Sequence, residues 1–201
     1  MQQTNGLALF DFDGTITRRD SLTHALKVIF PAWRFWLGWF LMVPVIIVWK
    51  LNLITNHRAK ELVLIHFFKG MSEHQFVQSA KSYSLEKIPG ILRPDAMEKL
   101  NWHLQQGHEV WVVTASVDLW LKPWTDSLGI NLISTTMEVK NGKMTGKLST
   151  PNNFGHEKAR RIREVIDLTR FKDIYAYGDT EGDREMLALA TFPHYRVFKG
   201  K

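Results

Sequence analysis

The chain has 201 residues, of which 45% are apolar and 23% charged, and these values suit one folded domain with an insertion and exclude a disordered chain. It contains no cysteine, which excludes disulfides, thiolate metal sites and cysteine nucleophiles. With 26 basic and 20 acidic residues the net charge is +6, which favours anionic partners such as phosphates, nucleic acid or acidic lipid.

The first predicted element is a buried β-strand over residues 6–10. This short apolar run stops at Asp11 and is followed by Asp13 and Gly14, as where a strand enters a turn. The residues before the strand carry no basic start, so we expect no secretory signal and a cytoplasmic protein.

Residues 20–90 are expected to form helices. Within them, residues 35–49 are a run without a formal charge, flanked by Arg34 and Lys50 and interrupted by Pro44. As a helix this run would be about 22 Å long, shorter than the ~30 Å hydrocarbon core of a bilayer.

From residue 91 onward, strands and helices are expected to alternate. The predicted elements are strands at 110–113 and 174–177, helices at 116–128, 156–168 and 182–190, and a hairpin at 139–144 around Asn141-Gly142. This alternation is typical of a parallel sheet covered by helices on both faces. We therefore expect a doubly wound α/β core made of residues 1–19 and 91–201, with residues 20–90 inserted as a helical unit.

Reactive residues follow the predicted strands. The first strand ends in Asp11-Phe12-Asp13-Gly14-Thr15, the second in Thr114-Ala115-Ser116, and the third in Gly178-Asp179 with Asp183 four residues on. The carboxyl ends of parallel strands meet at one edge of a sheet, where sites form. Lys158, in the first turn of a predicted helix, could supply a cation there.

Four carboxylates beside one lysine indicate a divalent cation. Without one they would repel and raise each other's pKa, and Mg²⁺ favours one or two carboxylates together with water and substrate phosphate. Asp11 could then attack phosphorus as a covalent nucleophile. Asp13, two residues on, could protonate the leaving oxygen and later accept a proton from the hydrolytic water.

The remaining residues are assigned supporting roles. The Thr114 hydroxyl and neighbouring backbone N–H groups, at Gly14 and Ala115, are expected to hold phosphoryl oxygens, and Lys158 to offset developing negative charge. Asp179 would complete the metal site, while Asp183 either holds a water molecule of the metal or orients Lys158.

This set of residues resembles the four motifs of the haloacid dehalogenase superfamily, present in order at Asp11 to Thr15, Thr114, Lys158, and Gly178-Asp179 with Asp183. The chain looks most like subfamily IB, the phosphoserine-phosphatase-like branch, in which a helical cap follows the first motif. The resemblance implies a Rossmann-like core, Mg²⁺, and phosphomonoester hydrolysis through an aspartyl phosphate. It places the metal ligands on Asp11, the Asp13 carbonyl and Asp179.

The cap is where substrate choice is expected. Phosphoserine phosphatases use a cap glutamate and arginine, and the comparable residues here are Asp20 and either Arg58 or Lys60. The usual glycine pair is replaced by Ala115-Ser116, and a usual asparagine by Gly182, so phosphoserine is the alternative substrate rather than the first one.

The tryptophan-rich segment 33–50 favours a lipid phosphate as the substrate. Trp33, Trp36, Trp39 and Trp49, with basic residues at both ends, resemble an interfacial membrane anchor. Phosphatidylglycerophosphatase-type members of subfamily IB carry an apolar stretch at this place. We expect the segment to lie in the headgroup layer on the inner face of the membrane, or to bend at Pro44, and to present an amphiphilic phosphomonoester. A core helix of the cap and a dimer interface are the alternatives.

Other classes of function fit less well. A phospho-acceptor signalling domain of the receiver type also combines an aspartate, acids on Mg²⁺, a threonine and a lysine, but it is shorter and lacks a cap. A membrane-associated structural protein with an inactive site would not need every acid that the chemistry uses. Nucleic acid is not an expected partner, because the basic residues are dispersed.

Overall fold

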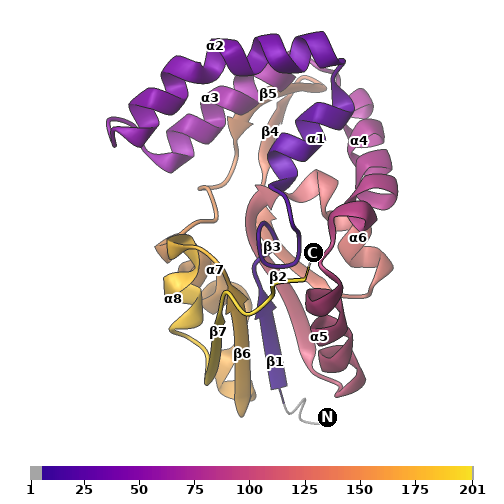
Figure 1. Cartoon of the computed structure of the whole chain (residues 1–201), viewed down its shortest axis with the longest axis vertical. Coiled ribbons are helices and arrows are strands. Elements are labelled where there is room, and N and C mark those ends of the chain that lie inside the picture. Colours follow the sequence, from indigo (N-terminus) through magenta and orange to yellow (C-terminus); the bar gives the residue numbers. More distant parts are fainter. Residues whose placement is uncertain (1–5, 201) are drawn as a thin grey trace.

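The computed structural model describes residues 6–200 and places a five-stranded parallel sheet below a helical cap (Figure 1). The sheet order is β3-β2-β1-β6-β7, and β4 and β5 pair separately as an antiparallel hairpin. The strands are β1 (Gly6–Phe10), β2 (Glu109–Val117), β3 (Asn131–Thr135), β4 (Met137–Lys140), β5 (Lys143–Leu148), β6 (Asp173–Gly178) and β7 (Phe192–Tyr195). The helices are α1 (Ser21–Ile29), α2 (Ala32–Lys50), α3 (Asn56–Phe68), α4 (Glu73–Ser82), α5 (Pro94–Gln105), α6 (Lys122–Ser127), α7 (His156–Val165) and α8 (Arg184–Leu187).

Strand β1 is buried on both sides and divides the core into two layers. Leu7 and Leu9 join one cluster with residues of α7 and α8, while Ala8 and Phe10 join the cluster that includes α5 and α6. Successive side chains of a strand point to opposite faces, so one apolar run serves both layers. The predicted doubly wound α/β fold is confirmed.

The order of the strands reverses at β1. The chain first builds outward through β2 and β3 on one side of β1, then returns to place β6 and β7 on the other side. A crevice opens at such a switch point, beyond the carboxyl ends of the strands. Residues that follow β1 and β6 are therefore brought together at the edge that faces the cap.

Three predicted helices differ from those in the structure. The helix expected at 116–128 is the shorter α6, because Val117 is buried and still pairs with Thr135 in the sheet. The helix expected at 182–190 is a 3-10 turn followed by the one-turn α8, and the helix expected at 156–168 ends at Val165. The edge strands β3 and β7 were not predicted, because they are short and β7 contains Pro193.

The tryptophan-rich segment forms one continuous helix, α2, on the outside of the cap (Figure 1). The alternative in which the segment bends back at Pro44 is therefore wrong. α2 packs on α3 through Gly38, where an added Cβ would lie 2.4 Å from the Phe67 ring. Only Phe35 and Gly38 of this helix are buried, so the alternative of a core helix is also wrong.

The predicted hairpin forms, and it packs against the cap rather than against the sheet (Figure 1). Asn141 and Gly142 both have positive φ, at 51° and 68°, as a type I′ turn requires. Gly146, with φ 79°, approaches α3 so closely that a Cβ would lie 2.3 Å from the Ile65 backbone. The backbone N–H of Gly70 also donates to the Met144 carbonyl at 2.9 Å. The hairpin therefore ties the cap to the second half of the core.

A buried histidine lies in the aromatic layer between α5 and the sheet. The His103 ring contacts His108 Nδ1 at 2.8 Å through its own Nδ1, and the Tyr177 hydroxyl at 2.9 Å through Nε2. Burial lowers the pKa of His103 from 6.5 to about 3, with further lowering by His108 and Lys99. The folded protein therefore holds this imidazole neutral.

This histidine predicts a loss of stability in mild acid. The unfolded chain binds the proton below pH 6.5 and the folded chain does not, so the contribution is complete above pH 6.5 and falls as the pH drops toward 3. Between pH 7 and pH 5, urea unfolding should show a decrease of about 1–2 kcal/mol from His103. His103→Gln should flatten this dependence, whereas His74→Gln, at an exposed position, should leave it unchanged. If the free energy of unfolding changes equally with pH in the wild type and in both variants, the prediction is wrong.

Candidate active site

Residues from four separate parts of the chain meet at the sheet edge below the cap. Asp11 follows β1, Thr114 lies in the last part of β2, Asp179 follows β6, and Lys158 comes from the first turn of α7. Asp11 is fixed by its backbone N–H, which donates to the Tyr177 carbonyl at 2.9 Å. The convergence follows from the parallel strands, because their carboxyl ends lie at the same edge.

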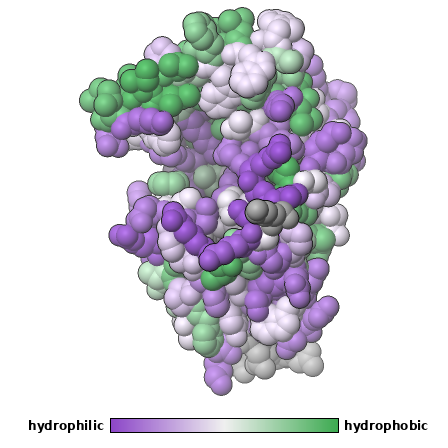
Figure 2. Space-filling model, in the orientation of Figure 1, coloured by the Kyte–Doolittle hydropathy of each residue, from purple (hydrophilic) through white to green (hydrophobic). Residues whose placement is uncertain are grey.

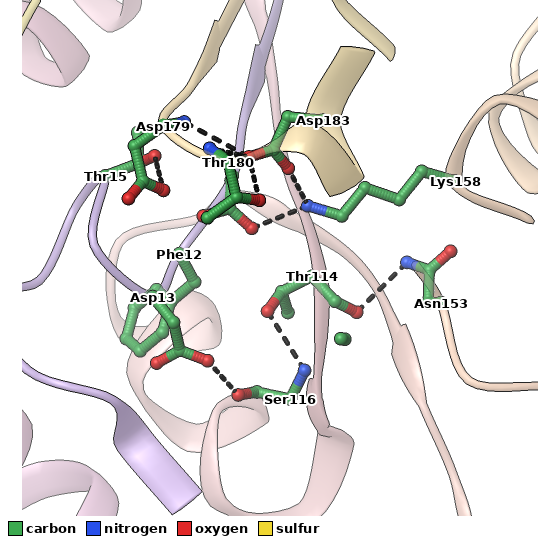
Figure 3. Close-up of polar contacts among 12 residues, drawn as sticks. Phe12, Asp13, Thr15, Thr114, Ser116, Asn153, Lys158, Asp179, Thr180 and Asp183 are labelled. Carbon is green, nitrogen blue, oxygen red and sulfur yellow. Dashed lines mark hydrogen bonds and ion pairs between the residues drawn. The ribbon is translucent and has the colours of Figure 1, made fainter. Parts of the chain in front are cut away.

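Lys158 lies between two buried carboxylates. Its Nζ donates to Asp11 Oδ1 and to Asp183 Oδ1, each at 2.6 Å. The other oxygen of Asp183 accepts from the backbone N–H groups of Asp179 and Thr180 and from the Thr180 hydroxyl (Figure 3). Both oxygens of Asp183 are thus engaged, and this residue orients Lys158.

The electrostatics of the site follow from burial. Burial raises the pKa of Asp11 to about 8, and the Asp183 charge adds to the shift although Lys158 opposes it. Burial also opposes the charge on Lys158, but Asp11 and Asp183 outweigh it and raise the pKa of the ammonium. Lys158 therefore stays charged, and one ammonium serves more than one carboxylate.

A cation would relieve the remaining excess of negative charge. Asp11, Asp179 and Asp183 each place a carboxylate oxygen within 4.8 Å of the others, and burial together with Asp183 raises the pKa of Asp179. Gly14, whose φ is 88°, makes this approach possible. A Cβ at this position would lie 2.4 Å from Asp179 Oδ2, and glycine has none. Such a set of hard oxygen ligands fits a divalent ion such as Mg²⁺.

Asp13 is turned away from this cluster (Figure 3). Its Oδ1 accepts from the Ser21 backbone N–H at 2.7 Å, and its Oδ2 accepts from the hydroxyls of Ser21 and Ser116. Burial raises the pKa of Asp13 to about 6, and the Asp20 charge contributes. The Asp13 side chain therefore lies outside the carboxylate cluster, which agrees with a family resemblance that assigns the metal to the Asp13 carbonyl rather than to its side chain.

Thr114 is buried at the end of β2, where its surroundings fix it. Its Oγ1 accepts from the Ser116 backbone N–H at 3.0 Å, and its carbonyl accepts from the Asn153 side chain at 3.0 Å (Figure 3). Ala115 and Gly14 line the same cavity, so the predicted phosphate-binding residues lie around one space.

A cavity of about 500 Å³ lies between the sheet edge and the cap, and Figure 2 shows the hollow below the overhanging end of the cap. Its lower wall is polar and includes Asp11, Asp13, Thr114 and Lys158. Its upper wall is apolar and is formed largely by Trp39, Val45, Ile46 and Trp49 of α2 with Ala59 and Val63 of α3.

The predicted cap residues divide into two groups. Asp20, which caps α1, and Lys60 line the cavity, whereas Arg58 pairs with Glu61 on the surface at 2.8 Å and does not. Lys60 Nζ donates to the Ala115 carbonyl and, at 3.3 Å, to Asn152 Oδ1. Burial lowers the pKa of Lys60 to about 8. Of the two basic residues predicted in the cap, Lys60 therefore lies at the cavity and Arg58 does not.

Several residues of the site were not predicted. Ser21 holds Asp13, and Asn152 and Asn153 fix Lys60 and Thr114 from the segment before α7. The Asn-Asn pair at 152–153 was a sequence signal, since two amides in a loop before a helix invite buried hydrogen bonds. Ser21 gives no such signal, because a serine beside an acid at a helix start is common.

The protein is a capped α/β protein. Its core is doubly wound, carboxylates lie at the switch point of the sheet, and a helical cap lies above them. The model of haloacid dehalogenase-like hydrolases matches residues 8–188, and the chain belongs to this family. The predicted membership and the prediction of a hydrolase of this type are confirmed.

The chain is also similar to a curated protein and to solved structures. Protein CicA of Caulobacter vibrioides is 36% identical over 202 residues, which cover 97% of this chain and 87% of that protein. A Bordetella pertussis protein of unknown function shares the fold with a TM-score of 0.79 at 23% identity, covering 94% of this chain and 88% of that one. A phospho-aspartyl intermediate analogue of phosphoserine phosphatase has a TM-score of 0.66 at 18% identity, covering 92% and 82%.

The buried lysine predicts a measurable coupling with its partners. Without cation, in chelator, Lys158→Met should lower the free energy of unfolding by about 3–5 kcal/mol, because it leaves buried carboxylates uncompensated. When Asp183 is already replaced by asparagine, Lys158→Met should lower the free energy of unfolding by about 1–3 kcal/mol less than it does in the wild type. Urea unfolding of the double-mutant cycle measures this coupling.

The exposed pair of Lys122 and Asp126, at 2.8 Å, provides the matched control. Lys122→Met should change stability by less than about 1 kcal/mol. If Lys158→Met costs no more than this control, the buried pairs do not hold the site together.

Proposed function

We propose that the protein is a Mg²⁺-dependent phosphomonoester hydrolase that works through an aspartyl phosphate. The observation that carries the proposal is the separation of the two acids that follow β1. Asp11 lies in the cation cluster against Lys158, whereas Asp13 faces Ser21 and Ser116 with its pKa raised to about 6. This separation supports the role of nucleophile for Asp11 and that of proton carrier for Asp13.

The cation site is assigned to Asp11, Asp179 and the Asp13 carbonyl, with Asp183 behind it. When bound there, Mg²⁺ would screen the charge between the nucleophile and the phosphate. Lys158 holds Asp11 in place and offsets the charge that develops on phosphoryl oxygens, together with the Thr114 hydroxyl and the backbone N–H groups near Gly14 and Ala115.

The reaction is expected to run in two steps. An Asp11 carboxylate oxygen bonds to phosphorus while the ester oxygen leaves with its electron pair and takes a proton from Asp13. Asp13, now ionised, accepts a proton from a water molecule that attacks the same phosphorus. The bond to Asp11 breaks, which releases phosphate and restores both acids.

The role of Asp13 predicts a dependence on the leaving group. Asp13→Asn should lower kcat/KM for an alkyl phosphate by about 10²–10⁴-fold, because an alkoxide needs a proton to leave. The effect on p-nitrophenyl phosphate should be much smaller, since a stable phenolate departs unprotonated, and the aspartyl phosphate should accumulate. Steady-state and burst kinetics measure both effects.

Two further variants complete this test. Asp11→Asn should abolish turnover of both substrates, and Asp126→Asn, exposed and paired with Lys122 away from the cavity, should change neither. Equal losses for the two substrates in Asp13→Asn would remove the proton-carrier role.

The cavity supports an amphiphilic phosphate as the substrate. A phosphate at Asp11 would have Lys60 and Asp20 beside its polar part, while the apolar wall from α2 and α3 faces the rest of the molecule. A small phosphate such as phosphoserine is the second candidate, because the same Asp20 and Lys60 line the cavity and the fold is shared with phosphoserine phosphatase. The apolar wall favours the first candidate, since a small polar substrate would leave it unused.

The apolar wall predicts a dependence on chain length. Across a series of alkyl phosphates kcat/KM should rise by up to about fourfold for each added CH₂, since burial of one contributes about 0.8 kcal/mol. Ile46→Asn should weaken this rise because Ile46 lines the cavity, whereas Ile47→Asn, one residue further and exposed, should preserve it. No dependence on chain length, with phosphoserine as the best substrate, would favour the second candidate.

A further inference from the structure

Helix α2 is apolar on both sides, but the cap covers only one of them. The outer face of α2 consists of Trp33, Trp36, Leu37, Phe40, Leu41 and Ile47, which recur at helical spacing and are all exposed. Trp33, Trp36 and Phe40 expose 69%, 66% and 72% of their surface. Trp39, which we expected on the same side, lies on the inner face with Val45 and Ile46. A helix that is apolar all round and not buried by its own protein is expected to be covered by another apolar surface, either a protein or a membrane.

The charge around this helix is of one sign. Residues 21–60 contain no aspartate or glutamate, while Lys27, Arg34 and Lys50 flank the helix region at its two ends. A symmetric contact between two copies would bring these like charges together without a carboxylate to pair them. An anionic surface complements them instead, and the exposed Trp33 and Trp36 near the start of the helix suit the boundary between headgroups and acyl chains.

We infer that the outer face of α2 docks on an anionic lipid bilayer, with the helix lying in the interfacial layer. Its 19 residues are long and apolar enough to cross a membrane, by length and composition only. Crossing would pull the inner face away from α3, where Phe35 and Gly38 are buried, and would dismantle the upper wall of the cavity. An interfacial orientation leaves both intact.

This placement connects the membrane with the site. The end of α2 and the residues that follow it overhang the hollow above the core, seen as an apolar projection in Figure 2. Leu51 and Leu53, just past the helix, are 63% and 70% exposed and continue the apolar surface toward this opening. The docked protein would thus hold its cavity beside the headgroup layer. This last step rests on the proposed function, whereas the docking itself does not.

Flotation with lipid vesicles, without substrate and in chelator, tests the docking separately from catalysis. The wild-type chain should float with vesicles of phosphatidylcholine containing roughly a third of phosphatidylglycerol, and much less with phosphatidylcholine alone. Trp36→Glu with Phe40→Glu should reduce the bound fraction about tenfold or more, because two aromatic anchors are replaced by anions. Hydrolysis of a short soluble phosphate should be unchanged, since neither residue lines the cavity.

A matched control separates the surface from the change of net charge. Val165→Glu with Lys172→Gln lowers the net charge by the same amount on the core, at exposed positions, and should float like the wild type. Urea unfolding confirms that both double variants are folded. Unchanged flotation of the α2 variant, or equal binding to neutral vesicles, would overturn the inference. So would a wild-type chain that ignores vesicles and sediments as a dimer that the α2 variant dissociates.

Discussion

The contact of Lys158 with Asp11 and Asp183 is the interaction on which the site depends. Three ionisable groups are buried at one sheet edge, and Lys158 Nζ lies 2.6 Å from a carboxylate oxygen of each of the other two. Without this pairing their burial would be costly. The pairing keeps the ammonium charged and fixes the nucleophile, while the pKa of Asp11 remains raised to about 8 by burial. A site of this kind is unfavourable by itself and is suited to a divalent cation and a phosphate, which complete its charge balance.

The fold supplies the geometry that this balance requires. The reversal of strand order at β1 brings the end of β6 next to the end of β1, and Gly14 leaves room for Asp179, because a Cβ at position 14 would lie 2.4 Å from Asp179 Oδ2. The second acid of the first motif is turned into a different environment by Ser21, at the start of the cap. Residues two positions apart therefore acquire different chemistry, because one faces the cation cluster and the other faces hydroxyl groups.

One helix of the cap, α2, faces the cavity on one side and is exposed on the other. Its inner face is a wall of the cavity and its outer face is open, and the hairpin of β4 and β5 holds the cap to the core through the close approach of Gly146 to α3. Lys60 reaches from the cap to the Ala115 carbonyl at the end of β2. Movement of the cap would therefore alter the polar and the apolar parts of the cavity together.

The sequence by itself predicted which residues meet at the site, because buried strands that end in Asp11, Thr114 and Asp179 bring these residues to the carboxyl edge of a parallel sheet. It also predicted the hairpin at Asn141-Gly142, whose backbone needs positive φ. Only the tertiary structure placed Lys60 rather than Arg58 at the cavity, continued β2 through Val117, and continued α2 as one helix past Pro44. These outcomes depend on contacts between residues far apart in the chain, which local pattern does not contain. The two faces of α2 are the clearest case, since its residues are apolar all round and only packing on α3 distinguishes the covered face from the open one.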